Sequence, residues 1–373
     1  MNFDFTDDQV SLRDAVQRWV EKGFSFDRRH ALAKAGGRTR DVYRELAELG
    51  LTGLAVSADH RGLGFGAVEA MVVMEELGRG LVNAPYAAAA LVAPTLLAQG
   101  DAALQSLWLP RIADGSALVV LAQQEHGARY RLETPTTVAS QAAGGWCLTG
   151  EKSLVPAGDE ADAFLVPARI GPEAIGPTGL FLIERDRCAV RGYPTQDGAR
   201  AAEVRLAAAP AQLVLADATV ALELATDVGI AANCAEAVGL MDQLVALTVE
   251  YMNTRKQFGV AIASFQALRH RMADVKMQLE LARSMSYYAS LKLGEPAAQR
   301  RRALSQAKVQ LGQSMRRVGQ ECIQLHGGIG VTDEVSVSHY FKRLTMLEMA
   351  HGDTLHHLGE VSERMQDTAG VFA

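Results

Sequence analysis

The spacing of apolar residues changes twice along the chain, and these changes restrict its fold more than any other sequence feature. Before residue 116, apolar residues recur at helical spacing in Asp4–Glu21, Asp41–Leu49, Val68–Leu77, Ala87–Leu97 and Asp101–Ile112. Residues 116–216 contain short strand-like runs between Gly, Asp and Pro turns, namely Ala117–Ala122, Trp146–Thr149, Lys152–Val155, Ala163–Val166 and Leu180–Ile183. From residue 217 the helical spacing returns.

The last part of the chain carries apolar stripes with the i, i+4, i+7 spacing of helices in a bundle. One stripe is Leu240, Leu244, Leu247 and Tyr251; the next is Leu268, Met272, Val275 and Leu279; the third is Leu304, Leu311, Met315, Val318 and Cys322. Strands and helices occur in separate blocks, which predicts an α+β fold. We predict a helical N-terminal domain (1–115), a middle β domain (116–216) and a C-terminal helical bundle domain (217–373).

Charge and composition exclude several classes of function. The net charge is −6 and no basic stripe is present, so nucleic acid is not an expected partner. The N-terminus is acidic and amphipathic, and no apolar run reaches transmembrane length, so we expect a cytoplasmic protein without membrane insertion. The cysteines, at positions Cys147, Cys188, Cys234 and Cys322, are scattered and read as buried thiols rather than disulfides or a zinc site.

Two motifs follow the first and the third bundle stripe. The stretch TRKQFGVAIASFQALRHRMADVK (254–276) places Arg255, a charged fork suited to an anionic group, before Gly259, where the chain can turn. The stretch QLHGGIGVTDEVSVSHYFKR (324–343) contains Gly327–Gly328, which permits close backbone approach to a ligand, and a helix is expected to begin near Thr332. Taken singly, each motif is also typical of a plain helix–turn–helix linker.

In this order and at this separation, the motifs R-x-Q-F-G…F-Q and Q-x-x-G-G-x-G resemble the acyl-CoA dehydrogenase family, and the resemblance covers essentially the whole chain. It implies an N-terminal all-α domain, a middle β-barrel-like domain and a C-terminal four-helix bundle, assembled as an oligomer. It further implies an FAD-dependent enzyme that oxidises an acyl-CoA thioester to the 2,3-enoyl-CoA. In such enzymes a carboxylate removes the α-proton and electron-transfer flavoprotein accepts the electrons.

The resemblance also assigns residues to the cofactor. Arg255, Gln257, Phe258, Gln324 and Gly328 match positions that hold the ADP half of an FAD bound mainly by a neighbouring subunit, and Gln266 fits the same pattern. Phe265 takes a position often held by His. In the flavin-facing stretches, Gln124 and Val155 take the matching positions, so we predict cofactor contacts for them as well.

The base position departs from the family pattern. Where many members read Y-E-G-T, this chain reads Ala350–His351–Gly352–Asp353, so His351 stands at the position of the catalytic Glu. Other members carry the Glu on the first bundle helix, but counting back from Arg255 by the family's spacing reaches Gly229. Asp227 lies nearby and points about 200° away on a helix. Neither usual base is present.

Two further departures concern the flavin-facing stretches. The family's T-E-P-x-x-G-S-D is replaced by QEHGARYR, residues 124–131, and its W-I-T-N by LVPA, residues 154–157. Pro156 removes a backbone donor, while Arg129 and Arg131 bind an anion or, alternatively, are solvated or seal an unused pocket.

All three departures fall in the pocket for the isoalloxazine ring and the acyl chain, which each subunit builds from its own residues. The sequence therefore predicts a companion subunit, of the pimeloyl-CoA dehydrogenase small-subunit type, that works with a base-carrying acyl-CoA dehydrogenase partner. A homo-oligomer remains open, and the alternative function is a non-catalytic structural subunit that binds little flavin.

The stretch MLEMAHGDTLHHL (346–358) allows several interpretations. A metal site at His351, His356 and His357 is disfavoured, because adjacent histidines diverge by about 100° on a helix, and we predict no metal. His351 or Asp353 is a substitute base, or else Asp353 caps a last helix whose histidines lie on its surface or at a subunit contact. His326 is expected to serve packing, with adenine contact as the alternative.

Overall fold

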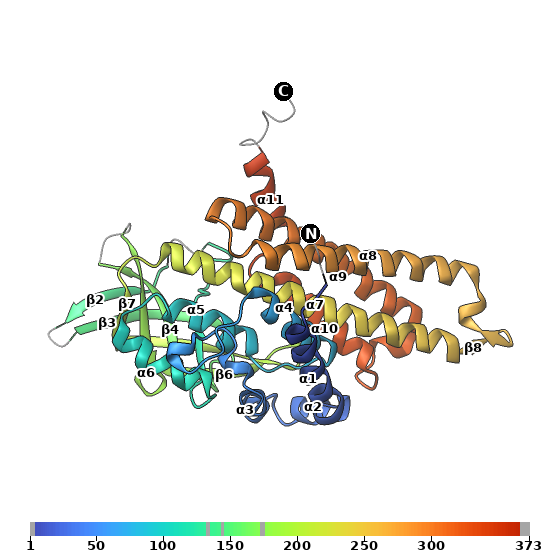
Figure 1. Ribbon diagram of the computed structural model, residues 1–373, viewed down its shortest axis with the longest axis horizontal. Helices are drawn as coiled ribbons and strands as arrows, with labels where there is room; N and C mark the ends of the chain where they lie inside the picture. Colours follow the sequence, from blue (N-terminus) through green and yellow to red (C-terminus); the bar gives the residue numbers. More distant parts are fainter. Residues whose placement is uncertain (1–3, 132–134, 143–144, 172–175, 366–373) are drawn as a thin grey trace. The chain divides into compact units, whose positions relative to one another are not determined.

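The computed structural model describes residues 4–131, 135–142, 145–171 and 176–365 (Figure 1). Its contacts divide the chain into two compact units. The helical unit comprises Met1–His30, Ala67–Val82 and Ile230–Ala373. The β-containing unit comprises Ala31–Gly66 and Asn83–Gly229. Each unit is therefore built from segments that are distant in sequence, and the division into domains at residues 115 and 216 stays a prediction.

The helical unit is built around long helices. They are α1 (Asp7–Gly23), the start of α2 (Phe26–Lys34), α4 (Ala67–Arg79), α7 (Thr219–Thr254) from Ile230 onward, α8 (Gln266–Lys292), α9 (Ala297–His326), α10 (Ser336–Met349) and α11 (Thr354–Met365). The short hairpin of β8 (Lys256–Gln257) and β9 (Val260–Ala261) is followed by a 3-10 turn, η5 (Ile262–Ser264). A second 3-10 turn, η6 (Gly327–Val331), follows α9.

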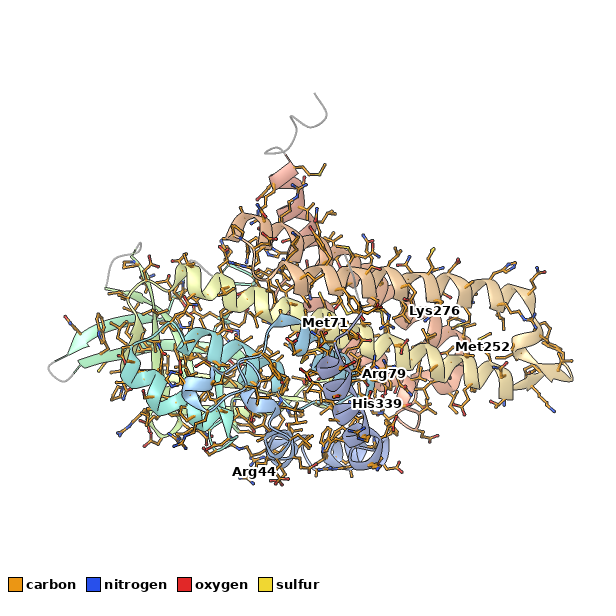
Figure 2. All side chains as sticks on the ribbon, viewed as in Figure 1. Arg44, Met71, Arg79, Met252, Lys276 and His339 are labelled. Carbon is orange, nitrogen blue, oxygen red and sulfur yellow. The ribbon has the colours of Figure 1, made fainter. Side chains whose placement is uncertain are left out.

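The predicted apolar stripes form the core of this unit. Leu240, Leu279 and Leu311 are representative: each is fully buried, and they belong to one cluster contributed by α7, α8, α9 and α10. Helices α8, α10 and α11 all pack against α9. Figure 2 shows the side chains of the helices, with Met252 labelled near the end of α7. The helical part of the prediction is therefore confirmed. A period near 3.6 residues explains the burial, since it places one stripe of each helix against its neighbours.

The β-containing unit combines short helices with a sheet. Its helical elements are α3 (Arg40–Glu48), η1 (Leu51–Gly53), η2 (Ala58–His60), the π-helix η3 (Ala87–Val92), α5 (Ala93–Leu97), α6 (Ala102–Ala113) and η4 (Arg185–Arg187). Its strands are β1 (Val119–Leu121), β2 (Val138–Ala142), β3 (Gly145–Pro156), β4 (Ala163–Ile170), β5 (Thr178–Glu184), β6 (Ala189–Pro194) and β7 (Arg200–Leu215). Asp101 caps α6 by accepting a hydrogen bond of 2.8 Å from the Leu104 amide.

The strands close on themselves. The sheet runs β1-β4-β2-β3-β7-β5, and β5 also pairs with β4, so β4, β2, β3, β7 and β5 form a ring with β1 and β6 at its margins. The long strand β7 makes this closure possible because it pairs with β3 along 201–211 and then with β5 along 212–215, while β6 pairs with its other edge along 200–205. The barrel-like β region and the α+β class agree with the expectation.

Several strand predictions were incomplete. The runs Trp146–Thr149 and Lys152–Val155 belong to one strand, β3, whose register against β7 shifts after Leu148 and after Lys152. The apolar spacing did not predict β2, β6, β7 or α2. Strand β7 is rich in Ala, which has low intrinsic strand propensity, and its pairing partners decide its conformation. The helix expected near Thr332 begins later, at Ser336, after the 3-10 turn η6.

By length and composition alone, α7 could cross a membrane. In the structure, 78% of its most apolar window is buried inside the protein. The core helix of a globular protein passes the same test, and α7 has the burial of such a helix.

Candidate functional site

The segment that follows α7 presents a turn with an exposed aromatic ring. Phe258 and Gly259 connect β8 to β9, with φ angles of 53° and 81°. Positive φ at both central residues is typical of a two-residue type I′ hairpin loop. Gly adopts this conformation without steric cost, whereas Phe is strained in it. The Phe258 side chain is 92% exposed as a result. Arg255, Gln257 and Gln266 are exposed in the same segment.

The structure brings this segment together with the second motif. The rings of Tyr251 and His326 stack with centroids 4.4 Å apart, and the Tyr251 hydroxyl donates to the His326 carbonyl at 3.3 Å. Ile262 and Leu325 share a small buried cluster with Met252. His326 Nδ1 lies 2.9 Å from the Cys322 carbonyl oxygen, and burial lowers its pKa. These contacts fit the packing role expected for His326.

The joined motifs offer an open surface to a ligand that approaches from outside the chain. Gln324 and Gly328 are exposed, and a Cβ atom added at Gly327 or Gly328 would meet no atom within 4 Å. The Arg255 guanidinium forms no ion pair with any of the residues that the structure describes. An exposed guanidinium in one motif and unobstructed glycine backbone in the other suit a phosphate-bearing group.

In the β-containing unit, a buried ion pair anchors the segment after β1. Lys152 Nζ lies 2.6 Å from a Glu125 carboxylate oxygen, and both side chains are almost fully buried. Thr136 and Thr137 each donate to this carboxylate from their hydroxyl and amide groups. Burial raises the pKa of Glu125, but the Lys152 charge and these hydrogen bonds outweigh it and lower the pKa to about 2. Glu125 is therefore ionised at any physiological pH.

The same pair positions the predicted flavin-facing residues. The Ser153 amide donates to the Gln124 carbonyl at 2.8 Å, which holds Gln124 beside β3. Val155 is 1% exposed and packs in the barrel core, so it has almost no surface available for contact with a ligand. The preceding residue, Leu154, has a φ of 52° and a side chain that is 56% exposed. At this point of the chain, the Leu154 side chain and not that of Val155 is therefore available for contact with a ligand.

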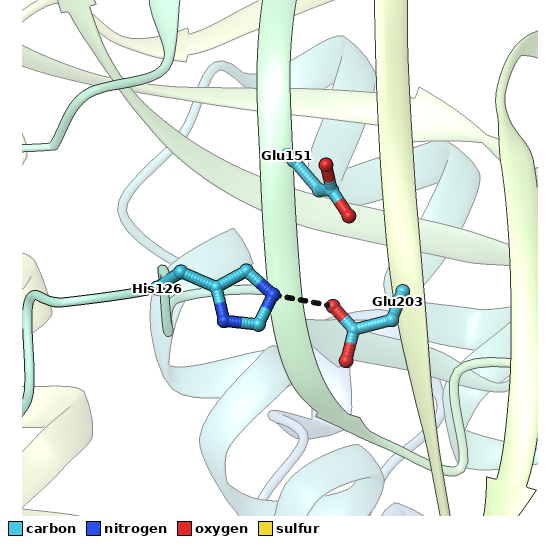
Figure 3. A group of neighbouring side chains, drawn as sticks. All are labelled: His126, Glu151 and Glu203. Carbon is cyan, nitrogen blue, oxygen red and sulfur yellow. Dashed lines mark ion pairs between the residues drawn. The ribbon is translucent and has the colours of Figure 1, made fainter.

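A further contact fastens the segment to β7. His126 Nε2 lies 3.4 Å from Glu203 Oε2 (Figure 3). The Tyr193 hydroxyl donates to Glu203 Oε1 at 2.8 Å. Glu151 completes a group whose ligand atoms lie within 4.8 Å of one another. His126 and Glu151 are exposed and Glu203 already has partners, so we read the group as a surface contact that ties residue 126 to the sheet.

The loop between α10 and α11 carries His351 and Asp353. Its turn relies on His351 with a φ of 57° and on Gly352 with a φ of 110°. A Cβ at Gly352 would lie 2.5 Å from the rings of His356 and His357, so only Gly fits there. Asp353 Oδ1 accepts a hydrogen bond of 2.8 Å from the His356 amide, which confirms the predicted helix cap. The Asp353 carboxylate is therefore engaged in a structural hydrogen bond.

The expectation that both following histidines lie on the helix surface was wrong for His357, which is 2% exposed. Its Nε2 lies 3.0 Å from the His351 carbonyl oxygen and its Nδ1 lies 3.3 Å from the Ser305 hydroxyl. Nε2 therefore donates and Nδ1 accepts, in a neutral ring. Burial lowers the pKa of His357 to about 3. A ring with both nitrogens occupied cannot join His351 and His356 around a metal.

Sequence reasoning missed a lysine behind this loop. Lys308 on α9 is 1% exposed, and its Nζ donates to the Leu347 carbonyl in the last turn of α10 at 2.5 Å. Burial lowers the pKa of Lys308 to about 8, although Cys234 and the Glu348 and Asp353 carboxylates favour its charged form. A sequence signal existed, because position 308 lies in the apolar stripe between Leu304 and Leu311.

Several residues in the selected stretches have a strained backbone. Positive φ angles occur there at Arg129 (48°), Leu154 (52°), Ala157 (47°), Phe258 (53°) and His351 (57°), and outside these stretches at Arg61, Leu81 and Ala208. A residue with a side chain in this region costs roughly 1–3 kcal/mol and persists where the surroundings enforce it, most often at functional sites. Five of these eight positions therefore lie in the stretches selected from sequence for cofactor and acyl binding.

Comparisons with known proteins agree with these segments. The family model for the acyl-CoA dehydrogenase N-terminal domain matches residues 6–116, and that for the C-terminal domain matches residues 219–366. Probable acyl-CoA dehydrogenase YngJ of Bacillus subtilis is 27% identical over 94% of this chain and 96% of its own length. Acyl-CoA dehydrogenase IpdE2 of Mycobacterium tuberculosis is 30% identical over 87% of this chain and 84% of its own.

Among solved structures, the ChsE4-ChsE5 complex from Mycobacterium tuberculosis contains a chain that matches with a TM-score of 0.88 at 26% identity, covering 98% of this chain and 99% of that one. The chain described here belongs to the acyl-CoA dehydrogenase family. As a member it is an oxidoreductase that acts on the CH–CH group of an acyl-CoA with a flavin acceptor, and its cofactor is FAD.

Proposed function

We propose that this chain is a companion subunit: it desaturates an acyl-CoA at the 2,3-position together with a second acyl-CoA dehydrogenase subunit that carries the catalytic base. The observation that supports the proposal is a contrast within one chain. The residues that fit the ADP end of FAD are intact and exposed, whereas His351 replaces the usual Glu on a loop held rigid by hydrogen bonds. Electron-transfer flavoprotein is the proposed electron acceptor.

The residues at the ADP end suit their proposed task. The Arg255 guanidinium would bind the pyrophosphate, and Gln257, Gln324 and the Gly328 backbone would contact the nucleotide, with Phe258 covering it. FAD, when bound, supplies the hydride acceptor. All these groups face outward, so they suit a flavin that is held mainly by another subunit.

The acyl end lacks a carboxylate base of its own. Asp353 caps α11, and His351 offers an exposed imidazole in place of a carboxylate. A positioned general base contributes about 10²–10⁴-fold, or roughly 3–5 kcal/mol of barrier. A subunit without one depends on a partner for ordinary turnover. The ChsE4-ChsE5 complex is an assembly of two different chains, which supports such a partnership by similarity.

The test compares the chain expressed alone with the chain expressed beside an acyl-CoA dehydrogenase homologue that carries the Glu. We expect FAD well below one per chain and little dye-linked turnover for the chain alone, and a rise of both on co-expression. Ordinary dehydrogenase turnover by the chain alone would refute the companion role.

A non-catalytic structural subunit is the alternative. It is favoured by the substituted flavin-facing stretch, in which Leu154 and Pro156 stand where the family has W-I-T-N. Substituting Arg255 in the co-expressed assembly discriminates the two. A companion that lends Arg255 to a flavin loses bound FAD, whereas a purely structural subunit does not.

A further inference from the structure

The hairpin between α7 and α8 exposes an aromatic ring that its own fold does not bury (Figure 1). Phe258 lies in the two-residue loop between β8 and β9, with a φ of 53°, and is 92% exposed. Loops of this type favour Asn followed by Gly, and an exposed apolar ring gains nothing from the hydrophobic effect. A strained backbone at such a ring therefore points to a role in binding.

The ring of Phe265 lies beside that of Phe258. The two ring centroids are 6.1 Å apart and the ring planes meet at 90°, which is the edge-to-face arrangement that aromatic rings prefer. Phe265 is itself 36% exposed, so the pair lies at the protein surface. Because Phe258 is 92% exposed, this contact leaves most of its ring surface open to a ligand.

Phe265 is anchored at the start of α8. Its amide donates to the Ile262 carbonyl at 3.1 Å, and its own carbonyl accepts from the Leu268 amide at 3.1 Å. Ile262 is buried in the small cluster that joins the two motifs, and its amide donates to the Arg255 carbonyl at 2.9 Å. The Phe265 ring therefore stands on backbone that is fixed both to α8 and to the segment that carries Arg255.

We propose that Phe265 is a positioning residue for nucleotide binding: its ring holds the ring of Phe258 at the tip of the hairpin, so that the open side of Phe258 stacks on the adenine of FAD. The inference rests on the proposed function, because it takes the ADP end of FAD as the ligand of this surface. It assigns a task to position 265, where an aromatic contact takes the place of a polar side chain.

The physical reason is preorganisation. An exposed aromatic side chain without a neighbour samples several rotamers, and fixing one of them on binding costs conformational entropy. An edge-to-face contact selects one orientation before the ligand arrives, and adenine offers a flat π-face to the ring that is held there. Loss of one such aromatic contact is expected to weaken FAD binding about 2–10-fold.

The first measurement follows the Phe258 ring by fluorine NMR in the full-length chain expressed alone. The phenylalanines are replaced by 4-fluorophenylalanine, and Phe258→Leu assigns the Phe258 signal through its absence. Phe265→Leu removes the supporting ring at similar volume, whereas Phe265→Tyr retains it. We expect the Phe258 signal to stand apart from its position in the unfolded chain in the original and in Phe265→Tyr. In Phe265→Leu it should move to that position and narrow.

A Phe258 signal that Phe265→Leu leaves unchanged would overturn the inference, since the ring would then be oriented without its neighbour. Circular dichroism and urea unfolding establish that each variant is folded before its spectrum is compared. Phe265 is 36% exposed, so neither substitution opens a cavity in the core of the helical unit.

The second measurement is the FAD dissociation constant of the assembly co-expressed with a base-carrying homologue. Phe265→Leu should raise it about 2–10-fold and Phe265→Tyr should leave it near the original value. Val260→Ala, another exposed apolar side chain of the hairpin, is the matched control. In a Phe258→Leu background, Phe265→Leu should have no further effect, because Phe265 acts only through Phe258. A full additional loss in that background would contradict the positioning role.

Arg255→Ala separates this inference from the proposed function. If Arg255→Ala weakens FAD binding and Phe265→Leu does not, the inference fails while the proposed function stands. If neither variant changes FAD binding, both fail, because the nucleotide surface then serves no flavin. If the chain alone turns over at ordinary dehydrogenase rates and Phe265→Leu weakens its FAD binding, the companion role fails while the role of Phe265 stands.

Discussion

His357 Nε2 donates a hydrogen bond of 3.0 Å to the carbonyl oxygen of His351, six residues earlier in the chain. This bond closes the turn that carries His351, the residue at the predicted base position. His357→Phe retains a planar ring but removes the donor and leaves the Ser305 hydroxyl and the His351 carbonyl without this partner. We expect the free energy of unfolding to fall by about 1–3 kcal/mol, measured by urea unfolding. The exposed His270→Phe is the matched control and should stay within about 0.5 kcal/mol of the original.

Glycine at position 239 is required by the crossing of α7 and α4. A Cβ there would lie 1.8 Å from the Glu75 carbonyl oxygen and 2.8 Å from the Arg79 amide nitrogen. Gly239→Ala therefore forces the helices apart, and overpacking of this kind costs about 1–3 kcal/mol or more. Thermal unfolding measures the loss.

Gly359→Ala in α11 is the control, because its Cβ would meet no atom within 4 Å. It should stabilise the protein by about 0.5–1 kcal/mol through helix propensity. Equal melting temperatures of the two variants would contradict the tight crossing.

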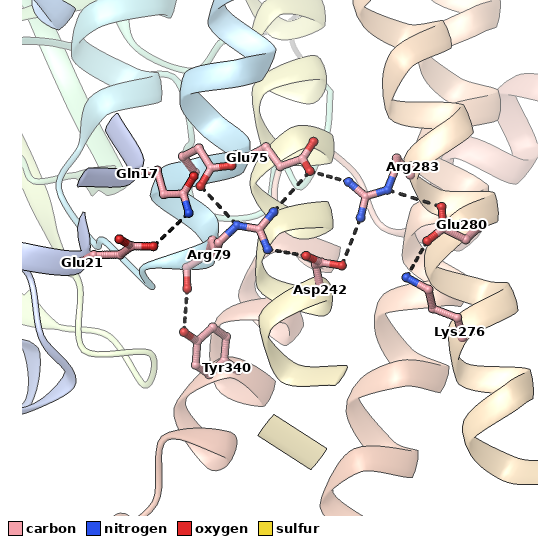
Figure 4. Close-up of polar contacts among 10 residues, drawn as sticks. Gln17, Glu21, Glu75, Arg79, Asp242, Lys276, Glu280, Arg283 and Tyr340 are labelled. Carbon is pink, nitrogen blue, oxygen red and sulfur yellow. Dashed lines mark hydrogen bonds and ion pairs between the residues drawn. The ribbon is translucent and has the colours of Figure 1, made fainter. Parts of the chain in front are cut away.

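The same crossing carries an ion-pair network (Figure 4). Arg79 pairs with Glu75 and Asp242, and Arg283 on α8 pairs with the same carboxylates. Displacement of α4 would separate these ion-pair partners. Arg283→Met should therefore lower the free energy of unfolding less in a Gly239→Ala background than in the original chain. A double-mutant cycle measures this coupling. Strict additivity would show that the network survives the displacement.

The Glu125–Lys152 pair should behave as a buried ion pair. Lys152→Met leaves the Glu125 carboxylate buried without its cation, and breaking such pairs costs about 3–5 kcal/mol. The double variant Lys152→Met with Glu125→Gln removes both charges and should cost less than the sum of the single substitutions. Urea unfolding of the four proteins gives the coupling. A double variant as destabilised as that sum would show that the two charges act independently.

Buried neutral histidines predict acid sensitivity. His326, His339 and His357 are buried, and burial is the chief cause that lowers the pKa of each. Below about pH 6.5 the unfolded chain takes up protons that the folded protein does not, so the free energy of unfolding falls as the pH falls. The contribution of these groups is complete above that pH and is lost as the pH drops through the folded values. Urea midpoints measured between about pH 7.5 and about pH 5 test the slope.

His339 should supply an identifiable part of this slope. Its Nδ1 lies 2.9 Å from Arg29 Nη1, and its Nε2 lies 3.1 Å from the Asp333 carbonyl oxygen. A proton on Nδ1 would face the Arg29 guanidinium. His339→Gln should therefore reduce the pH dependence, while His270→Gln on the exposed surface should not. A slope that His339→Gln leaves intact would locate the acid sensitivity elsewhere.

We predict that Arg255 contributes to FAD binding and not to folding stability. Its side chain is exposed, so Arg255→Ala should change the free energy of unfolding by less than about 0.5 kcal/mol. In the co-expressed assembly it should lower the FAD content, because a guanidinium–phosphate contact is lost. Lys256→Ala, the exposed neighbouring cation, is the control. Equal FAD content in both variants would contradict the assignment of Arg255.

Much of the helical architecture could be predicted from sequence, because helical periodicity is a local property. The stripes through Leu240, Leu279 and Leu311 are buried as their spacing indicates, and Asp353 caps α11. The motif residues Arg255 and Gln324 are exposed on adjacent segments. The strand β7 escaped prediction, because an Ala-rich stretch becomes a strand only through pairing with β3, β5 and β6.

The sequence by itself predicts which residues stand at the family's base and nucleotide positions, with His351 where many members have a glutamate. Only the tertiary structure decided how that histidine is held. Lys308 reaches Leu347 across 39 residues of sequence, and His357 meets Ser305 across 52. Burial of a charge depends on desolvation by distant segments and on the partners they bring, and neither appears in local spacing.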